Sequence, residues 1–308
     1  MVEMTELSVA PVPLRPLSRD QITRRLSQCA RLPSLSTINS ALRELLNADQ
    51  RYTTQIAEII RRDPSLTARL LRLVNSVYYG HSTPVNSIEE AVFYLGVRQI
   101  RQLVMVTPVI EDFTKLAGKT AFAWREFWQH CIGTAILTRE VIGAQQTPAD
   151  EVDYVSGLIH DVGKIVMAAV CPEHFEAIYR HPAPAAPEDL LAHEAAVLGM
   201  DHAELGALYL ESHHLPEVLV EIARCHHQPE RASHNPPLVA AVHIADMVVR
   251  HARIGNSGNR TIVSDDDWLN APAWDLLLPG RPEGEKAMAR ASLKRSLERL
   301  PLILEGLV

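Results

Sequence analysis

The chain has 308 residues, of which 47% are hydrophobic, so it is long enough to bury a core as one large domain or two small ones. Its formal net charge of −7 is uneven, because residues 1–120 carry 15 basic and 11 acidic side chains and residues 121–308 carry 15 and 26. The acidic part holds most of the histidines, which argues against direct DNA binding, while the mildly basic first part leaves room for an anionic partner.

The first part of the chain is predicted to contain a tail and a helical bundle. Residues 1–20 have the composition of a disordered tail, and after them apolar residues recur at intervals of three and four almost everywhere. Residues 63–80 open with an Asp-Pro pair suited to a helix start and end at a glycine. A capping box at residues 87–90 begins another helix. We assign residues 21–118 to an N-terminal helical bundle and expect an all-α fold.

A second helical block, residues 119–252, is predicted to carry the chemistry. Its first helix would bury a stripe of Phe127, Cys131 and Ala135. The next helix would end at the pair His160-Asp161, with Gly163 in the turn that follows. The residues expected to begin its helices are Ala121, Asp150, Asp201, Pro216 and Pro237.

Residues 253–308 are predicted to add a loop and a terminal helix. Segments 255–261 and 279–285 have the composition of loops, as has the Pro-rich segment 181–187 in the preceding block. A stripe of leucines, Leu293, Leu297, Leu300 and Leu304, predicts that the last helix packs on the bundle, following Trp268 and Trp274. No chemistry is assigned to this part.

Histidines mark the candidate site. Thirteen of the fourteen lie between His130 and His251. Imidazoles and carboxylates on successive helices supply the nitrogen and oxygen ligands that borderline and hard divalent metals bind. The polar residues singled out are Glu126, His130, His160, Asp161, His202, His226, His227 and Asp246.

These residues differ in how strongly they indicate a metal. Glu126 and His130 are four residues apart and would share one helix face, although such pairs are also common on solvated faces. The pair His160-Asp161 follows an apolar helix, where two buried polar side chains are costly unless they are paired or bind an ion. An aspartate there could bridge two metals, but a histidine at a helix end beside a capping aspartate would need no metal.

The later candidates carry the same two interpretations. His202 follows the expected cap Asp201, and a lone histidine is more often a surface residue. The doublet His226-His227 could divide its imidazoles between two metals, or could simply suit the dipole at a helix C-terminus. Asp246 gives the strongest indication, because burying an aspartate within an apolar helix costs free energy unless a positive charge compensates it. The remaining histidines are assigned to the surface, to packing or to support of the ligands.

The cysteines and the apolar runs indicate a compartment. The four cysteines are widely separated and form no CxxC pair, which argues against a zinc ribbon or a disulfide scaffold and favours a reducing environment. Residues 1–20 lack the apolar stretch of a signal peptide, and no later run approaches the ~20 residues of a membrane span. We therefore expect a cytoplasmic protein without membrane association.

Several motifs together resemble one family. The order His, His-Asp, Asp, with Gly-Lys after the His-Asp, is similar to the HD-domain superfamily of metal-dependent phosphohydrolases. The runs Leu32-Pro33-Ser34-Leu35, Asp63-Pro64-Ser65-Leu66, Leu73-Val74-Asn75-Ser76, Asp201-His202-Ala203-Glu204-Leu205-Gly206 and His226-His227-x-Pro229 resemble the HDOD family within it. The resemblance spans about residues 21–252.

This resemblance implies a function and a ligand set. HDOD proteins are regulatory modules of bacterial signal transduction, which implies a signalling protein as partner. Compared with the related HD-GYP phosphodiesterases, which cleave cyclic di-GMP, the eight residues above correspond to metal ligands, and Lys164 to a lysine that contacts phosphate. The resemblance thus implies two divalent ions, with iron or manganese preferred over nickel or zinc, and Asp161 and Lys164 as the candidate catalytic pair. Residues 228–231 replace the longer GYP-bearing loop of those phosphodiesterases.

Three functions stay open from the sequence. The first is a regulatory module whose metal is structural or sensory and whose output is contact with a partner. The second is a metal-dependent phosphohydrolase that acts on a cyclic dinucleotide, nucleotide or other phosphodiester through an activated water. The third is a helical scaffold that has kept the ligands but binds no ion.

Overall fold

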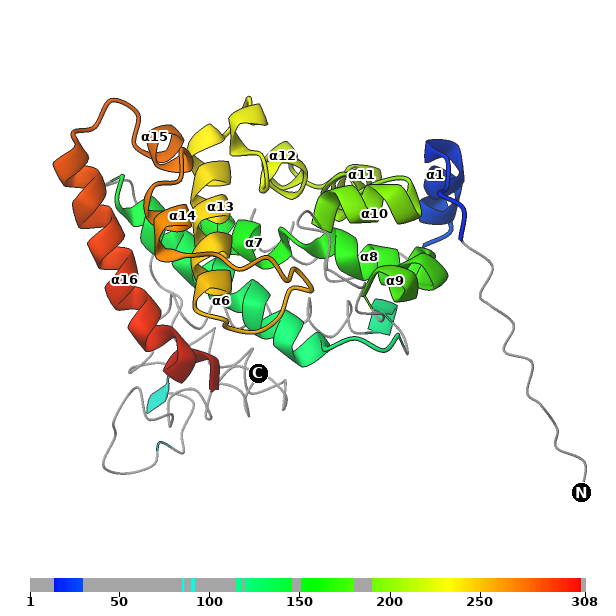
Figure 1. Cartoon of the computed structure of the whole chain (residues 1–308), viewed down its shortest axis with the longest axis horizontal. Coiled ribbons are helices and arrows are strands. Elements are labelled where there is room, and N and C mark those ends of the chain that lie inside the picture. The colour runs from blue at the N-terminus through cyan, green and yellow to red at the C-terminus, as the bar shows by residue number, and fades with distance from the viewer. Residues whose placement is uncertain are drawn as a thin grey trace, which may run out of the picture.

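The computed structural model describes residues 14–29, 85, 90–91, 115–117, 120–145, 151–179 and 190–305. The regular elements of these residues are all helices, which confirms the predicted all-α fold. The predicted helix over 63–80 and the loop 181–187 lie outside the described residues, as does most of the helix expected from residue 87. The elements are α1 (Arg19–Ser27), α6 (Trp124–Gly143), α7 (Glu151–Ile159), α8 (Val162–Val170), α9 (Pro172–Tyr179), α10 (Leu190–Leu198), α11 (His202–Ser212), α12 (Glu217–Cys225), η1 (Pro229–Arg231), α13 (Pro236–His251), α14 (Asp265–Leu269), α15 (Ala273–Leu277) and α16 (Glu283–Glu305). Figure 1 shows α1 and α16 at opposite ends of the described part.

Helix α6 forms the centre of the core. The predicted stripe of Phe127, Cys131 and Ala135 is fully buried, and α7, α13 and α16 all pack against this helix. Burying each large apolar side chain stabilises the fold by about 1.5–3 kcal/mol. The stripe therefore holds α6 between the helices that carry the candidate ligands.

The turn between α7 and α8 presents two polar residues to the interior. Helix α7 ends at Ile159, and His160 and Asp161 form the turn before α8 begins at Val162. The prediction that Gly163 lies in this turn is wrong, because Gly163 is the second residue of α8. Its missing side chain instead allows α8 to contact α11, where a Cβ atom on Gly163 would lie 1.8 Å from the His202 carbonyl oxygen.

The later helices begin close to where their sequences predict. Asp201 caps α11, and its carboxylate accepts a hydrogen bond of 2.8 Å from the Glu204 backbone N–H, an interaction of about 1 kcal/mol. Pro216 directly precedes α12. Helix α13 begins at Pro236, one residue before the predicted Pro237. These starts place His202 in the first turn of α11 and His226 just after the last turn of α12.

The C-terminal part closes the core from a second side. Trp268 on α14 and Trp274 on α15 are buried, and the Trp274 indole N–H donates to the Trp268 carbonyl at 2.8 Å. Helix α16 packs on α6, as the leucine stripe predicts. Segment 255–261 is irregular, as expected, whereas the predicted loop 279–285 is shorter, since α16 begins at Glu283.

Helix α1 begins earlier than expected and packs on the second block. The capping box at Ser18 starts the helix at Arg19, so the last two residues of the predicted tail, Arg19 and Asp20, are helical. The Leu17 N–H donates to the Leu198 carbonyl at 2.7 Å, and Arg25 forms an ion pair of 2.6 Å with Glu173. The domain boundary after residue 118 stays a prediction.

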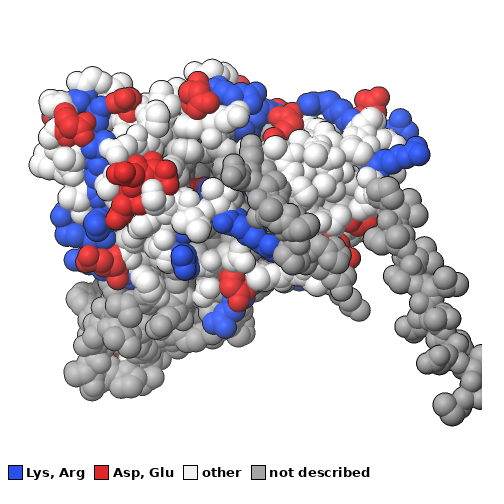
Figure 2. All heavy atoms as spheres, in the orientation of Figure 1, with Lys and Arg blue, Asp and Glu red and all other residues white. Residues whose placement is uncertain are grey.

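The described surface is mixed in charge. On the face shown in Figure 2, lysine and arginine side chains are interspersed with aspartate and glutamate. Within the described ranges, every helix is too short or too polar to cross a membrane.

Candidate metal centre

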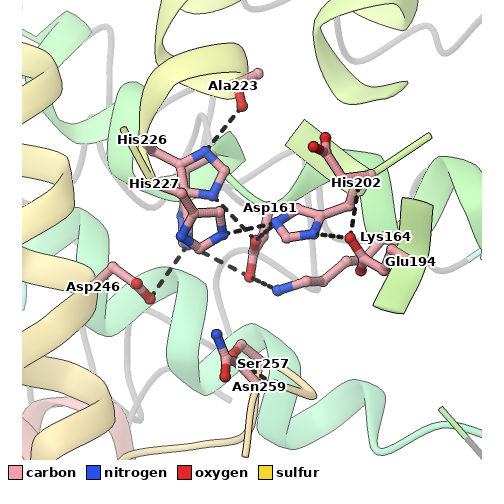
Figure 3. Close-up of polar contacts among 12 residues, drawn as sticks. Asp161, Lys164, Glu194, His202, Ala223, His226, His227, Asp246, Ser257 and Asn259 are labelled. Carbon is pink, nitrogen blue, oxygen red and sulfur yellow. Dashed lines mark hydrogen bonds and ion pairs between the residues drawn. The ribbon is translucent and has the colours of Figure 1, made fainter. Parts of the chain in front are cut away.

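Seven of the eight candidate ligands come together in the interior. They lie on five different segments: His130 on α6, His160 and Asp161 in the turn before α8, His202 on α11, His226 and His227 after α12, and Asp246 on α13. All except His227 are at most 3% exposed. Figure 3 shows Asp161 between His202 and the His226-His227 doublet. Residues far apart in the chain therefore share one pocket.

The cluster consists of two groups that share Asp161. In the first group, Asp161 Oδ1 lies 3.1 Å from His202 Nε2 and 3.6 Å from His226 Nε2. His227 Nε2 completes this group at 3.0 Å from His202 Nε2. We call these four residues the first group.

The other oxygen of Asp161 faces the second group. Asp161 Oδ2 lies 3.5 Å from His160 Nε2 and 3.8 Å from His130 Nε2. Asp246 Oδ1 is 3.1 Å from His130 Nε2 and 3.9 Å from His160 Nε2. We call His130, His160, Asp161 and Asp246 the second group. Each carboxylate oxygen of Asp161 thus faces a different set of imidazoles, which is the arrangement of a bridging ligand.

The protein fixes which ring nitrogen faces the cluster. The Nδ1 of His160 lies 2.7 Å from the Gly157 carbonyl oxygen, and the Nδ1 of His226 lies 2.9 Å from the Ala223 carbonyl oxygen. A carbonyl can only accept, so each Nδ1 donates, and in a neutral ring the Nε2 then keeps its lone pair. Burial lowers the pKa of His160 to about 3, which keeps that ring neutral at pH 7. A neutral imidazole with a free Nε2 is the form that binds metals.

Two atoms of the cluster have no hydrogen-bond partner. Asp161 Oδ1 and His226 Nε2 are buried and unsatisfied, and the 3.1 Å approach of His202 to Asp161 Oδ1 lacks hydrogen-bond geometry. Buried unsatisfied polar atoms are rare, and each costs about 1–3 kcal/mol. Because both atoms point acceptor lone pairs at the same space, a cation between them would satisfy both. The residues present therefore fit a divalent metal.

A lysine and an arginine balance the two buried carboxylates of the cluster. Lys164 lies 2.6 Å from Asp161, and Arg250 lies 3.5 Å from Asp246. Burial by itself would raise the pKa of Asp161, but the Lys164 ammonium and the nearby imidazoles hold it well below its usual range. The pKa of Asp246 is likewise held well below its usual range, because His130 and Arg250 outweigh burial. Both carboxylates are therefore ionised and available as ligands.

Glu126 is not part of the cluster, contrary to the sequence prediction. It lies in the first turn of α6 and is exposed. Its backbone carbonyl accepts a hydrogen bond of 2.9 Å from Asn256, and its side chain belongs to neither group. His130, one turn further along, is buried. The i,i+4 spacing predicts that both residues lie on one helix face. It does not show at which residue this face stops being buried.

Glu194 is a functional candidate that the sequence analysis missed. This carboxylate on α10 is fully buried and accepts from both the backbone and the ring of His202. Burial would lower the pKa of His202, but Glu194 raises it to about 9, so an ion bound at Nε2 would displace a proton from this ring. Like Asp246, Glu194 is an acidic residue within an apolar helix, and this signal could have identified it from the sequence. His243 supports the cluster as well, since its Nδ1 donates to the His226 carbonyl at 2.7 Å.

Comparisons with known proteins show the fold and the family. An uncharacterized protein of Treponema pallidum (strain Nichols) is 27% identical over 228 residues, which cover 71% of this chain and 43% of that protein. This chain thus spans less than half the length of that relative.

Two solved structures share the fold over nearly their whole length. An HDOD domain protein of unknown function from Geobacter sulfurreducens is 24% identical, with a TM-score of 0.77 over 94% of this chain and 97% of that one. A candidate phosphohydrolase from Shewanella amazonensis SB2B is 23% identical, with a TM-score of 0.67 over 94% and 98%. The family model of the HDOD domain matches residues 32–229. Because this match covers more than half of the 308 residues, the chain belongs to the HDOD family.

Proposed function

We propose that this protein is a regulatory HDOD module that holds two divalent ions in the buried cluster and acts mainly by binding a signalling protein. The first ion would be held by Asp161, His202, His226 and His227, and the second by His130, His160, Asp161 and Asp246. The observation that carries the metal assignment is the pair of buried, unsatisfied acceptors, Asp161 Oδ1 and His226 Nε2, 3.6 Å apart. A divalent ion between these two atoms would satisfy both of them.

The nature of the ligands limits the metal. The set consists of imidazoles and carboxylates, which suit iron, manganese, nickel and zinc. Cys131 is also buried nearby, but burial raises the pKa of its thiol well above the usual range, so it does not supply a thiolate. We prefer iron or manganese on the resemblance to HD-domain proteins. Bound ions would lower the pKa of a coordinated water and stabilise the fold by tying five segments together.

Two observations favour regulation over catalysis. Lys164, the residue that resemblance assigns to a substrate phosphate, is 1% exposed, and its ammonium is engaged by Asp161 at 2.6 Å. A phosphate would first have to displace this ion pair. The segment after the histidine doublet forms only the short helix η1 and leads directly to α13. It offers no long loop that could hold a cyclic dinucleotide.

The alternative is a metal-dependent phosphohydrolase, which the shared Asp161 and the name of the Shewanella neighbour favour. In that function the two groups would hold a water, and Lys164 would offset the charge that develops on a phosphodiester or nucleotide.

The two functions can be separated with the purified full-length chain. The protein is prepared without affinity metals, loaded with Mn²⁺ or with Fe²⁺ under anaerobic conditions, and assayed with cyclic di-GMP, nucleotides and bis(p-nitrophenyl) phosphate. We expect bound ions and no turnover. Turnover that disappears in Asp161→Ala, while the helical circular dichroism is unchanged, would reject the regulatory proposal in favour of the enzyme.

A further inference from the structure

Glu194 uses both carboxylate oxygens to connect two other elements. Its Oε2 accepts a hydrogen bond of 2.8 Å from the His202 backbone N–H and one of 2.6 Å from the ring Nδ1. Its Oε1 accepts from the hydroxyl of Tyr179, at the end of α9. Figure 3 shows Glu194 on the side of His202 that faces away from Asp161. Glu194 is therefore behind a candidate ligand and is not itself one.

The contact that orients His202 differs in its chemistry from the contacts that orient His160 and His226. His160 and His226 donate their Nδ1–H to neutral backbone carbonyls, whereas His202 donates to a carboxylate. A hydrogen bond to an ionised acceptor is roughly twice as strong as one between neutral groups. It also makes the opposite ring nitrogen a better metal ligand. His202 belongs to the first group but not to the second.

Tyr179 holds Glu194 from the opposite side and is itself fixed by packing. Its ring lies 4.6 Å from that of Phe175 and 5.4 Å from that of Phe122, measured between centroids. The backbone of Gly258, at a φ of +83°, leaves so little room that a Cβ atom there would lie 2.6 Å from the Tyr179 ring. The tyrosine hydroxyl therefore has little freedom to move away from Glu194.

We propose that Glu194, anchored by Tyr179, is a positioning residue that sets the metal affinity of the first group alone. It directs the Nε2 of His202 into the cluster and strengthens this nitrogen as a ligand. The described hydrogen bonds of Glu194 go to His202 and Tyr179 and not to the second group. One of the two histidines of the second group, His160, is oriented by a backbone carbonyl that no side-chain substitution removes. This inference rests on the proposed function, because it requires that the cluster binds metal.

The test compares the full-length wild type with Glu194→Gln in Mn²⁺ titrations. Glutamine keeps the size of the side chain but removes its charge. We expect one of the two binding steps to weaken by about 10- to 100-fold, with the other unchanged. At two equivalents of Mn²⁺, electron paramagnetic resonance should show a spin-coupled pair in the wild type and a six-line signal of an isolated ion in the variant. A substitution that only loosened the fold would weaken both steps.

Glu221→Gln is the matched control. Glu221 is also a buried carboxylate, and it accepts hydrogen bonds from the backbone N–H groups of Ser233, His234 and Asn235. It belongs to neither metal group, so its substitution should leave both binding steps as in the wild type. Tyr179→Phe removes only the hydroxyl that anchors Glu194. It should weaken the same step as Glu194→Gln by a smaller factor, and it keeps the test valid if the glutamine variant does not fold.

The outcomes separate this inference from the proposed function. A wild type that takes up no Mn²⁺ overturns the proposed function itself. A wild type that binds two ions while both Glu194→Gln and Tyr179→Phe bind them with wild-type affinity overturns only the positioning role. Equal weakening of both steps in a variant with unchanged circular dichroism would also overturn it, because the proposal assigns Glu194 to the first group.

Discussion

Gly163 determines how closely α8 approaches α11, and through this contact it determines where His202 lies relative to Asp161. A Cβ atom at position 163 would lie 1.8 Å from the His202 carbonyl oxygen and 2.8 Å from the Gly206 nitrogen. Both are backbone atoms, so no side-chain rotation can relieve the clash. In Gly163→Ala the two helices would have to separate by roughly 1.5 Å to restore an ordinary contact.

The expected loss of stability follows from this displacement of the two helices. Overpacking a close contact costs about 1–3 kcal/mol, and more where backbone must move. Since about 1 kcal/mol changes the melting temperature of a domain of this size by roughly 2–4 °C, we expect Gly163→Ala to melt several degrees lower. The same movement carries His202 away from Asp161 Oδ1, which it now approaches to 3.1 Å. The variant should therefore also bind less metal.

Differential scanning calorimetry and metal analysis of the full-length chain measure both effects. The control is Gly143→Ala at the end of α6, where a Cβ atom would meet nothing within 4 Å. This substitution should leave stability unchanged or raise it by up to about 1 kcal/mol. A Gly163→Ala chain with the melting temperature and metal content of the wild type would refute the close contact and its role in placing His202.

Further substitutions test the assignment of single residues. His160→Ala or Asp161→Ala should lower metal content and melting temperature, because bound metal stabilises the folded state; unchanged stoichiometry in both would overturn the ligand assignment. Glu126→Gln should leave metal content unchanged, and a loss of metal would show that its exposed carboxylate takes part. Backbone N–H groups outweigh burial and lower the pKa of Glu221 in the folded chain. Its stabilising effect is therefore present above an unfolded pKa of about 4.3 and is lost as the pH falls through the lower folded value. In urea titrations from pH 7 to pH 3, the stability gap between wild type and Glu221→Gln should shrink with falling pH, and a gap that does not change would contradict this role.

Local patterns were sufficient to predict about half of the described α-helices, namely α6, α7, α11, α12, α13 and α16. The stripe around Phe127, the cap at Asp201 and the prolines before α12 and α13 act through neighbouring residues, so their positions can be read from spacing. Asp246 is also predictable, because a carboxylate within an apolar helix needs a partner wherever the helix packs.

The errors arise where a residue acts over a long distance in the chain. Gly163 has the residue type of a turn, but it serves a contact with α11, about 40 residues further along. Glu126 has the right spacing from His130, but the end of the buried region depends on how segment 255–261 covers α6. Glu194 could be singled out as an acidic residue in an apolar helix, but its contacts with His202 and Tyr179 depend on how α9, α10 and α11 pack. The convergence of the seven ligands was likewise implied by family resemblance and could not follow from spacing.

The most direct test of the metal centre is elemental analysis of the full-length chain, expressed and purified without an affinity metal, beside Asp161→Ala prepared in the same way. Asp161 contributes one oxygen to each group, so we predict about two transition-metal ions per wild-type chain, and loss of both in the variant. A wild-type chain that carries no ion and takes none up from Mn²⁺ or Fe²⁺ would contradict the account.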